Sequence, residues 1–429
     1  MPHPAAGLVL AVTPVLLVAV LACREDASRL MEPPSKPADQ VAADPPLAFR
    51  QVGTGEDRSC GVTNDNVAYC WGGSDGPGAG TRPVPVPGDH AFRQVSAEGR
   101  FHACGVTMGN VAYCWGANHL GALGDGTWTD SPRPVRVAGG LAFRQVSAGV
   151  LHTCGVTTDN VAYCWGHNQA GPLGDGTTDF SNRPVRVARQ LAFREVTAGE
   201  QFTCGVTTDD RAWCWGVNGA GELGTGSISG PEFCFTGDAE PPCSTRPVRV
   251  VRGLAFRALD AGYGHVCGVT RDDLAYCWGR NGYGELGHGS NSGPEDCEGS
   301  CSTRPVRVAG RLRFASVTGG VNHTCGVTPA NVAYCWGLND FGQLGIGTRQ
   351  GPEACHLLFV TPEEGVPCST RPVPVYGEHA FRSLAAGDWF SCGVKTSRVA
   401  FCWGYNGDGR LGDGTTQSRL RPRRVADPG

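Results

Sequence analysis

The chain has 429 residues, of which 64 are glycine and 30 are proline, and only 8% are aromatic. This composition argues against long helices and favours many short strands, because glycine and proline interrupt regular elements. The formal net charge of -4 provides no concentrated basic character, so nucleic acid is not expected as a partner.

Residues 1–22 are expected to be a signal peptide. Leu8–Leu21 is an apolar run too short to span a membrane but long enough for the core of a secretion signal, although no Lys or Arg precedes it. The run ends in Val20-Leu21-Ala22-Cys23, which resembles a bacterial lipoprotein box. Cleavage before Cys23 would then be followed by lipid attachment to its sulfur, whereas ordinary cleavage would leave a free thiol.

Residues 23–46 are expected to be a lipidated cysteine followed by a disordered tether. The segment combines several prolines with charged and small residues, a composition that stays solvated. The protein is therefore expected to be exported and anchored through lipid to a bacterial membrane, facing the periplasm or the cell exterior.

The rest of the chain contains a cysteine pair that recurs seven times. In each copy a cysteine is followed ten residues later by a second one, which opens the tripeptide Cys-Trp-Gly. The pairs are Cys60 with Cys70, Cys104 with Cys114, Cys154 with Cys164, Cys204 with Cys214, Cys267 with Cys277, Cys325 with Cys335 and Cys392 with Cys402. Six further cysteines pair as Cys234 with Cys243, Cys297 with Cys301 and Cys355 with Cys368, so only Cys23 is left over among the 21.

Twenty of these cysteines are expected to form structural disulfides. An exported chain meets an oxidising compartment, and the even number supports complete pairing. Zinc is not expected, because tetrahedral zinc sites favour close-set pairs such as Cys-x-x-Cys and the repeats contain none.

The third copy shows the strand pattern of the repeat. Leu141–Val146, His152–Thr157, Val161–Trp165 and Arg183–Val187 each read as a strand, and Cys154 opposes Cys164 across a hairpin. Its three-residue loop needs a left-handed residue at the third position. Asn or Asp stands there in six copies, at Asn66, Asn110, Asn160, Asp210, Asp273 and Asn331.

Seven copies of four strands predict an all-β, seven-bladed β-propeller of four-stranded antiparallel blades that closes near the two ends of residues 47–429. The expected repeats are 47–90, 91–140, 141–190, 191–253, 254–311, 312–379 and 380–429. The first copy lacks the Gly-x-Leu-Gly segment of the others and is expected to form a thin blade.

The repeat resembles that of the regulator of chromosome condensation family. The resemblance rests on His152-Thr-Cys-Gly-Val-Thr, Tyr163-Cys-Trp-Gly and Asn168-Gln-Ala-Gly-Pro-Leu-Gly-Asp-Gly, and it extends from Leu47 to the C-terminus. It implies the propeller fold and protein binding through a propeller face. The family's eukaryotic namesake is a guanine nucleotide exchange factor, and secreted bacterial β-lactamase inhibitors have a similar fold.

Three inserted loops are the candidate recognition surface. Each lies after Gly-x-Gly and before Ser-Thr-Arg-Pro in copies four to six, contains Gly-Pro-Glu and a cysteine pair, and all three are expected on one face. The candidate partner-binding residues are Phe233, Phe235, Leu357, Leu358 and Phe359. They equally fit an interpretation in which they pack around the disulfides of their own loops.

Catalysis is not expected. His102, His152, His265 and His323 precede the first cysteine of their copies, but other copies carry Phe or Arg there, which indicates a packing position. Asp125, Asp175 and Asp413 lie in Gly-Asp-Gly turns, where a carboxylate usually stabilises the backbone.

The sequence therefore predicts a monomeric, non-enzymatic recognition propeller without cofactor or metal. It would be tethered to a membrane and would bind a protein or surface polymer outside the cytoplasm. The alternatives are an exchange factor for a small GTPase, a structural envelope protein and a secreted enzyme inhibitor.

Overall fold

The computed structural model describes residues 47–73, 79–99, 101–234, 240–293, 295–297, 300–356 and 365–429. The expected signal peptide, the lipidation site at Cys23 and the tether lie outside the described residues. Among the described residues, no helix is long and apolar enough to cross a membrane.

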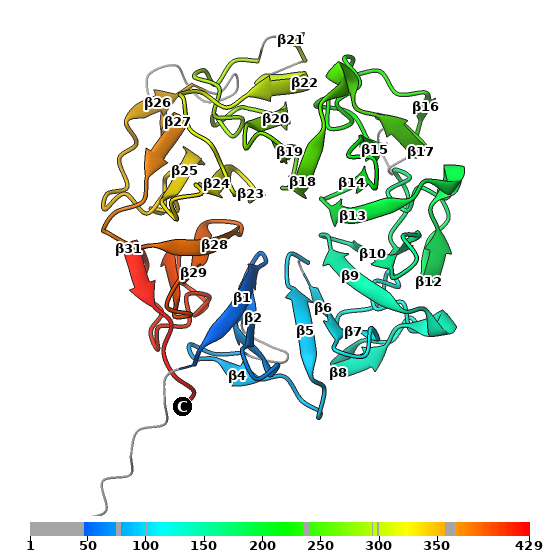
Figure 1. Ribbon diagram of the computed structural model, residues 1–429, viewed down its shortest axis with the longest axis horizontal. Coiled ribbons are helices and arrows are strands. Elements are labelled where there is room, and N and C mark those ends of the chain that lie inside the picture. Colours follow the sequence, from blue (N-terminus) through cyan, green and yellow to red (C-terminus); the bar gives the residue numbers. More distant parts are fainter. Residues whose placement is uncertain are drawn as a thin grey trace, which may run out of the picture. The chain divides into compact units, whose positions relative to one another are not determined.

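Seven antiparallel sheets form a ring, and each is one blade (Figure 1). The innermost strands are β1 (Phe49–Thr54), β5 (Phe92–Ser96), β9 (Phe143–Ala148), β13 (Phe193–Ala198), β18 (Phe256–Ala261), β23 (Ser316–Gly319) and β28 (Phe381–Ala386). The second strands are β2 (Arg58–Thr63), β6 (His102–Thr107), β10 (His152–Thr157), β14 (Phe202–Thr207), β19 (His265–Thr270), β24 (His323–Val327) and β29 (Phe390–Lys395). The third strands are β3 (Ala68–Gly72), β7 (Ala112–Gly116), β11 (Ala162–Gly166), β15 (Ala212–Val217), β20 (Ala275–Arg280), β25 (Ala333–Leu338) and β30 (Ala400–Gly404).

The outer strands complete the blades. They are β4 (Val84–Pro85), β8 (Ser131–Arg136), β12 (Ser181–Arg186), β17 (Pro242–Arg249), β22 (Ser300–Arg307), β27 (Val366–Pro374) and β31 (Arg419–Arg424). Short 3-10 turns, η1 (Ala138–Gly140), η2 (Ala188–Gln190) and η3 (Val251–Gly253), follow three of them. The predicted all-β, seven-bladed propeller is confirmed.

The hairpin between the second and third strands has the predicted register. Cys154 lies directly opposite Cys164, and their α-carbons are 4.0 Å apart. Asn160, the third loop residue, has a φ of 69°. The other five predicted Asn and Asp residues also have positive φ, and the seventh blade has Arg398 in this conformation with a φ of 69°.

Disulfide bonds join all ten predicted cysteine pairs. Seven of them cross the hairpin between the second and third strands of a blade, and they join Cys60 to Cys70, Cys104 to Cys114, Cys154 to Cys164, Cys204 to Cys214, Cys267 to Cys277, Cys325 to Cys335 and Cys392 to Cys402. The other three lie in the insertions of blades four to six, and they join Cys234 to Cys243, Cys297 to Cys301 and Cys355 to Cys368. Every blade is therefore bridged at least once.

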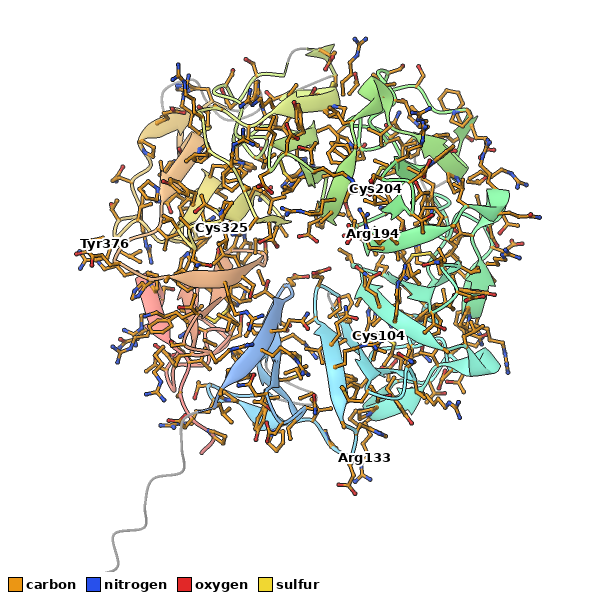
Figure 2. All side chains as sticks on the ribbon, in the orientation of Figure 1. Cys104, Arg133, Arg194, Cys204, Cys325 and Tyr376 are labelled. Atoms are coloured by element: carbon orange, nitrogen blue, oxygen red, sulfur yellow. A yellow bond between two sulfur atoms is a disulfide. The ribbon has the colours of Figure 1, made fainter. Side chains whose placement is uncertain are left out.

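The hydrophobic core lies between neighbouring blades. Between the second and third blades, Cys104, Cys114 and Leu123 of one blade pack with Phe143 and Trp165 of the next. All five are at most 1% exposed. Figure 2 shows Cys104, Cys204 and Cys325 within the body of the blades, whereas Arg133 and Tyr376 lie at the perimeter. A blade cannot bury its apolar face alone, so the disulfides stiffen the surfaces on which blades stack.

A loop from each complete blade attaches to the following one. In the second blade, Asn118 accepts a hydrogen bond from the Leu123 amide through its side-chain oxygen, at 2.9 Å. This holds the Gly-x-Leu-Gly turn against the third blade, where the Trp165 indole donates to the Ala122 carbonyl at 2.9 Å. A Cβ on Gly124 would lie 2.6 Å from the Trp165 ring, so the turn needs glycine. The repeated motif is thus an inter-blade latch.

The first blade is thin and the ring closes without strand exchange. Its outer strand β4 has two residues, whereas β8 and β12 have six each. The first and last blades keep separate sheets, and the Phe49 amide donates to the Arg398 carbonyl at 2.7 Å. The equivalent bond between Phe143 and Asn110 joins the second and third blades at 2.8 Å. The closure therefore uses the same contact as the other blade junctions.

The cysteine-bridged insertions differ from the expectation. They were expected as loops, but their described parts add a fifth strand to the outer edge of blades four to six, as β16 (Glu232–Phe233), β21 (Glu295–Asp296) and β26 (Glu353–Cys355). The physical reason is that each bridge ends in the outer strand itself, as the bridge of Cys234 does at Cys243 in β17. Cys301 in β22 and Cys368 in β27 likewise end the other two bridges within the outer strands of their blades. The insertion is thus held as a strand against an open sheet edge.

Candidate functional site

The central opening of the ring is bordered by the loops between innermost and second strands. The side of the ring that carries these loops, together with the loops between third and outer strands, is called the mouth face below. Neighbouring loops are joined: the Val150 amide donates to the Gly199 carbonyl at 3.2 Å, and the Asp388 amide donates to the Gly55 carbonyl at 3.3 Å. A Cβ on Gly55 would lie 2.1 Å from the Ala97 carbonyl oxygen, so this close approach requires glycine.

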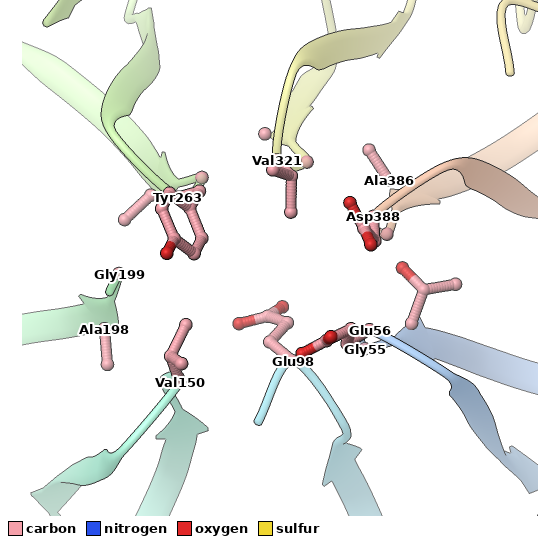
Figure 3. Close-up of a pocket in the computed structure, with 16 residues that line it drawn as sticks. Gly55, Glu56, Glu98, Val150, Ala198, Gly199, Tyr263, Val321, Ala386 and Asp388 are labelled. Carbon is pink, nitrogen blue, oxygen red and sulfur yellow. The ribbon is translucent and has the colours of Figure 1, made fainter. Parts of the chain in front are cut away.

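Carboxylates gather on one side of this opening. A pocket of about 230 Å³ is lined by Glu56, Glu98 and Asp388 from the first, second and seventh blades. Their side chains point inward, and Tyr263 lies across the opening from them (Figure 3). Glu98 is there because the loop of the second blade is one residue longer than that of the third blade. The ring thus brings together acidic side chains from loops that are far apart in the sequence.

Below the mouth, a channel of about 310 Å³ is lined by polar side chains of the innermost strands. The Gln94 amide donates to the Val146 carbonyl at 2.7 Å and accepts from the Val146 amide at 3.1 Å. Gln145 makes the same two contacts with Val196. These amides bridge neighbouring strands that cannot pair directly, so their role is structural.

Two channel positions carry carboxyl groups instead. Glu195, at the position of Gln145 in the next blade, accepts from the Leu259 amide at 2.7 Å. Asp260 accepts from the Gly319 amide at 3.0 Å. Burial raises the pKa of Glu195 to about 7 and that of Asp260 to about 6. Burial, followed by the charge of Asp260, holds the pKa of Glu98 well above its ordinary value. The channel therefore concentrates carboxyl groups whose burial favours the protonated form.

An aromatic cluster stands beside the acidic side of the mouth. Phe341, Trp389 and Tyr405 are half-buried, with ring centroids 5.2 to 5.7 Å apart. The Arg410 guanidinium lies 4.8 Å from the centre of the Tyr405 ring. Aromatic groups with a wet edge are common in protein interfaces, because they bury a large area with few rotamers.

Two further aromatic side chains extend this surface over the second and third blades. Trp128 and Phe180 belong to loops that follow the third strand, and they are 48% and 37% exposed. Phe180 packs on His167 with centroids 4.7 Å apart. The mouth face therefore combines exposed rings with a centre lined by carboxyl groups.

The opposite end of the channel is bordered by arginines instead. Arg144 on β9 donates to the Phe193 and Arg194 carbonyls of the next blade and to the Asn160 side chain. Arg93 makes the corresponding contacts with Phe143 and Arg144. The two ends of the channel thus carry different ionisable groups.

The recurrent histidines are packing residues between blades. The His152 Nε2 atom lies 2.8 Å from the Thr203 hydroxyl of the next blade, and that hydroxyl donates to the Pro172 carbonyl. Since the hydroxyl donates to that carbonyl, it accepts a hydrogen bond from the Nε2–H group, and burial disfavours a second proton on the ring. Burial lowers the pKa of His152 to about 3. His102, His265 and His323 have equivalent contacts and lowered pKa values.

The turn aspartates have the backbone role that their motif indicates. Asp125, Asp175 and Asp413 each accept a hydrogen bond from the amide two residues later, at 2.9 to 3.0 Å.

The predicted partner-binding residues are not brought to the mouth. Phe233 is 71% exposed on the fifth strand of the fourth blade, at the outer edge. Phe235, Leu357, Leu358 and Phe359 lie outside the described residues. The mouth was not predicted from the sequence. In the sequence, the mouth is indicated by the additional residue Glu98 and by Glu56 and Asp388, which follow the loop glycines of the first and last copies.

One group of potential metal ligands occurs among the described residues. Ligand atoms of Glu232, Cys234 and Cys243 lie within 4.8 Å of one another. Both sulfurs are bonded in a disulfide, so they cannot serve as thiolate ligands.

Comparison with known proteins places this architecture among characterised propellers. The family model described as RCC1-like domain matches residues 97–428. The ultraviolet-B receptor UVR8 of Arabidopsis thaliana is 26% identical over 179 residues, which cover 42% of this chain and 36% of the receptor. The probable E3 ubiquitin-protein ligase HERC4 of Homo sapiens is 25% identical over 180 residues, which cover 42% of this chain and 15% of the ligase. The chain thus spans about a third or less of these relatives.

Solved structures show the same fold. Yeast RCC1 (Prp20), bound to Kap60, superposes with a TM-score of 0.69 at 18% identity, covering 94% of this chain and 91% of that chain. Human WBSCR16 superposes with a TM-score of 0.66 at 17% identity, covering 81% and 85%.

Proposed function

This chain belongs to the RCC1-like domain family, and on that premise we propose that it is a non-enzymatic recognition propeller that binds a partner protein through its mouth face. The observation that carries this proposal is the surface itself. A centre lined by carboxyl groups is surrounded by the Trp128, Phe180 and Phe341–Trp389–Tyr405 aromatic groups, all on loops held by a rigid ring. Rigid loops lose less conformational entropy on binding than mobile ones.

Relatives support the choice of a protein as partner. Prp20p of Saccharomyces cerevisiae has been described with its binding to Gsp1p and to histones, and yeast RCC1 has been solved bound to Kap60. At 20% identity or less these structures carry the fold alone, so the identity of the partner does not transfer. A surface polymer is the second candidate, since exposed aromatic rings also stack on sugars.

We place the protein outside the cytoplasm, anchored to a membrane. The ten disulfides support this, since disulfides persist in oxidising compartments and are rare in the cytosol. The same bridges disfavour an intracellular exchange factor. The resemblance of Val20-Leu21-Ala22-Cys23 to a lipoprotein box supports the anchor.

The compartment is tested by the intact mass of the protein purified from its native membrane, before and after reduction and alkylation. A mass that fits cleavage before Cys23, added acyl groups and ten disulfides supports the proposal. Retention of Met1 with free thiols would contradict it and would favour the exchange factor.

The binding face is tested by crosslinking the full-length protein in the native envelope and comparing the partners captured by variants. The double variant Trp128→Ala with Phe180→Ala removes exposed rings from the mouth face. Met108→Ala is the matched control, because Met108 is 54% exposed on a hairpin at the opposite face. A partner lost by the double variant and kept by the control supports the proposal. A partner lost equally by both, or by neither, contradicts it.

A further inference from the structure

We propose that Glu195 is a pH-sensitive staple between the fourth and fifth blades. Its protonated carboxyl group binds both the backbone amide and the backbone carbonyl of Leu259, and its ionised form binds the amide alone. This inference goes beyond the proposed function and does not depend on it. It rests on a comparison of equivalent positions around the ring.

The three preceding blades have glutamine at the position of Glu195. Gln51, Gln94 and Gln145 each lie opposite a valine of the second strand, as Glu195 does. The Gln145 side chain donates to the Val196 carbonyl at 2.6 Å and accepts from the Val196 amide at 3.1 Å. Gln94 makes the same pair of contacts with the third blade. The position is thus built for a side chain that offers one donor and one acceptor to the next blade.

Leu259 is the residue that Glu195 meets in the fifth blade. Leu259 has the register position in β18 that Val196 has in β13, and its amide donates to the Glu195 carboxyl at 2.7 Å. By this equivalence the second carboxyl oxygen of Glu195 stands where Gln145 places its N–H group. A protonated carboxyl group offers a donor there, whereas a carboxylate offers only acceptors and would face the Leu259 carbonyl unpaired. Protonated Glu195 therefore reproduces the contacts of glutamine.

The groups packed against Glu195 act on its proton in both directions. Burial favours the neutral form, and the charge of Asp260, next to Leu259 in β18, favours it as well. The Leu259 amide and the charges of Arg194 and Arg144 favour the ionised form. Burial is the largest of these effects, and the pKa of Glu195 is raised to about 7.

The other charged groups nearby leave this balance in place. Arg194 is paired with Asp210, and Arg257 of β18 is paired with Asp273 at 3.1 Å. Glu98 lines the same channel from the second blade, and burial holds its pKa well above the ordinary value. A change of pH near neutrality therefore acts on the staple itself.

The staple lies close to the mouth. Strand β13 ends at Ala198, and both Ala198 and the following Gly199 line the mouth pocket, as Tyr263 does from the fifth blade. The junction between these two blades is thus firmer in mild acid than in mild alkali. The pH outside the cell would in this way adjust how tightly two loops of the mouth are held together.

The direction of the effect on stability follows from proton binding. Glutamate has a pKa of 4.5 without these surroundings, so between 4.5 and about 7 the folded protein holds a proton that the unfolded chain releases. The stabilisation is present in acid and is lost as pH rises through this window. If the ring unfolds as one unit, the melting temperature should lose about 3 °C between pH 5 and pH 8 through Glu195.

The test compares melting temperatures of the full-length, oxidised protein at pH 5 and pH 8. Glu195→Gln carries the donor at every pH, so it should melt within about 1 °C of wild type at pH 5 and about 3 °C above it at pH 8. The reciprocal variant Gln145→Glu should melt about 3 °C below wild type at pH 8 and close to it at pH 5. Glu378→Gln, which removes an exposed carboxyl group, is the control and should follow wild type at both.

Two further measurements separate a staple from a carboxyl group that is merely buried. Glu195→Met keeps the size and removes both contacts, so it should melt about 2 °C below Glu195→Gln at either pH. In protein labelled with ¹³C-glutamate, the carboxyl signal that Glu195→Gln removes should titrate near pH 7.

A titration of the Glu195 carboxyl below about pH 5 would overturn the inference, because the carboxyl group would then be ionised throughout. Equal melting of Glu195→Gln and wild type at pH 8 would also overturn it. A Glu195→Met variant that melts as high as Glu195→Gln would show a buried position without a staple. The crosslinking experiment does not measure this junction, so either proposal can fail while the other stands.

Discussion

The latch asparagine of the third blade offers a quantitative test of how the ring is held together. The Asn168 side chain is fully buried. Its oxygen accepts from the Leu173 amide at 2.9 Å, and its nitrogen donates to the Thr177 and Asp179 carbonyls at 3.1 and 3.0 Å. Asn168→Ala removes these three bonds, together with a longer contact of 3.4 Å to the Thr177 hydroxyl, and leaves the buried Leu173 amide without its acceptor.

The expected cost of Asn168→Ala is about 3 kcal/mol, at about 1 kcal/mol for each lost bond. If residues 47–429 unfold as one unit, an unfolding entropy of about 2.1 cal/mol/K per residue gives about 0.8 kcal/mol/K, so the melting temperature should fall by about 4 °C. Asn168→Asp keeps the acceptor for Leu173 but turns two carbonyl contacts into repulsions, so it should be no more stable than the alanine variant.

The assay is thermal and urea unfolding under non-reducing conditions, followed by tryptophan fluorescence. Asn182→Ala, in outer strand β12 of the same blade, is the control, because no described residue contacts its side chain through a hydrogen bond. A fall below about 1 °C for Asn168→Ala, or an equal fall for the control, would refute the argument that the latch stabilises the ring.

Three further predictions concern the blade junctions. The pKa of His152 is about 3 in the folded protein and about 6.5 in the unfolded one, so between these values the unfolded state binds more protons and this residue lowers stability as pH falls from about 6.5 towards 3. Replacing His152 with phenylalanine, which two other blades carry at this position, should therefore reduce the fall of the urea midpoint between pH 7 and pH 4.5. An unchanged fall would contradict this. Removing the bridge between Cys154 and Cys164 by a double alanine substitution should cost about 2 to 3 kcal/mol in urea unfolding, and a midpoint equal to wild type would show that strand pairing alone holds the hairpin. Arg398→Asn should raise the melting temperature by about 1 °C, since asparagine tolerates the positive φ better than arginine does, whereas a lower value would point to a role for the guanidinium.

Much of the fold could be predicted because its determinants are local. The register of Cys154 with Cys164 and the left-handed loop residue Asn160 follow from neighbours within a few positions, and both recur along the chain. The fifth strands were expected as loops, because the sequence shows the bridge from Cys234 to Cys243 but not that Cys243 already belongs to a strand with an open edge.

The candidate site could not be predicted in the same way, because it exists only once the ring has closed. Glu56 and Asp388 lie at opposite ends of the repeat region, and they line one pocket because the first and seventh blades are neighbours. Glu98 was visible as an additional residue, but its direction towards the axis follows from the loop of a blade whose position the sequence does not give.

The way in which the first and seventh blades meet has a consequence for protein engineering. The bond from Phe49 to Arg398 repeats the bond that joins other blades, and the Leu47 amide lies 3.2 Å from an Asp427 carboxyl oxygen. Among the described residues, the first and seventh blades thus meet through the contact that joins other blades, with the Leu47–Asp427 hydrogen bond added to it. A circular permutant, with the old ends joined by a short Gly-Ser linker and new ends cut at the exposed 3-10 turn η1, should fold into the same seven blades, and its acidic mouth would then be encoded by adjacent stretches of the gene.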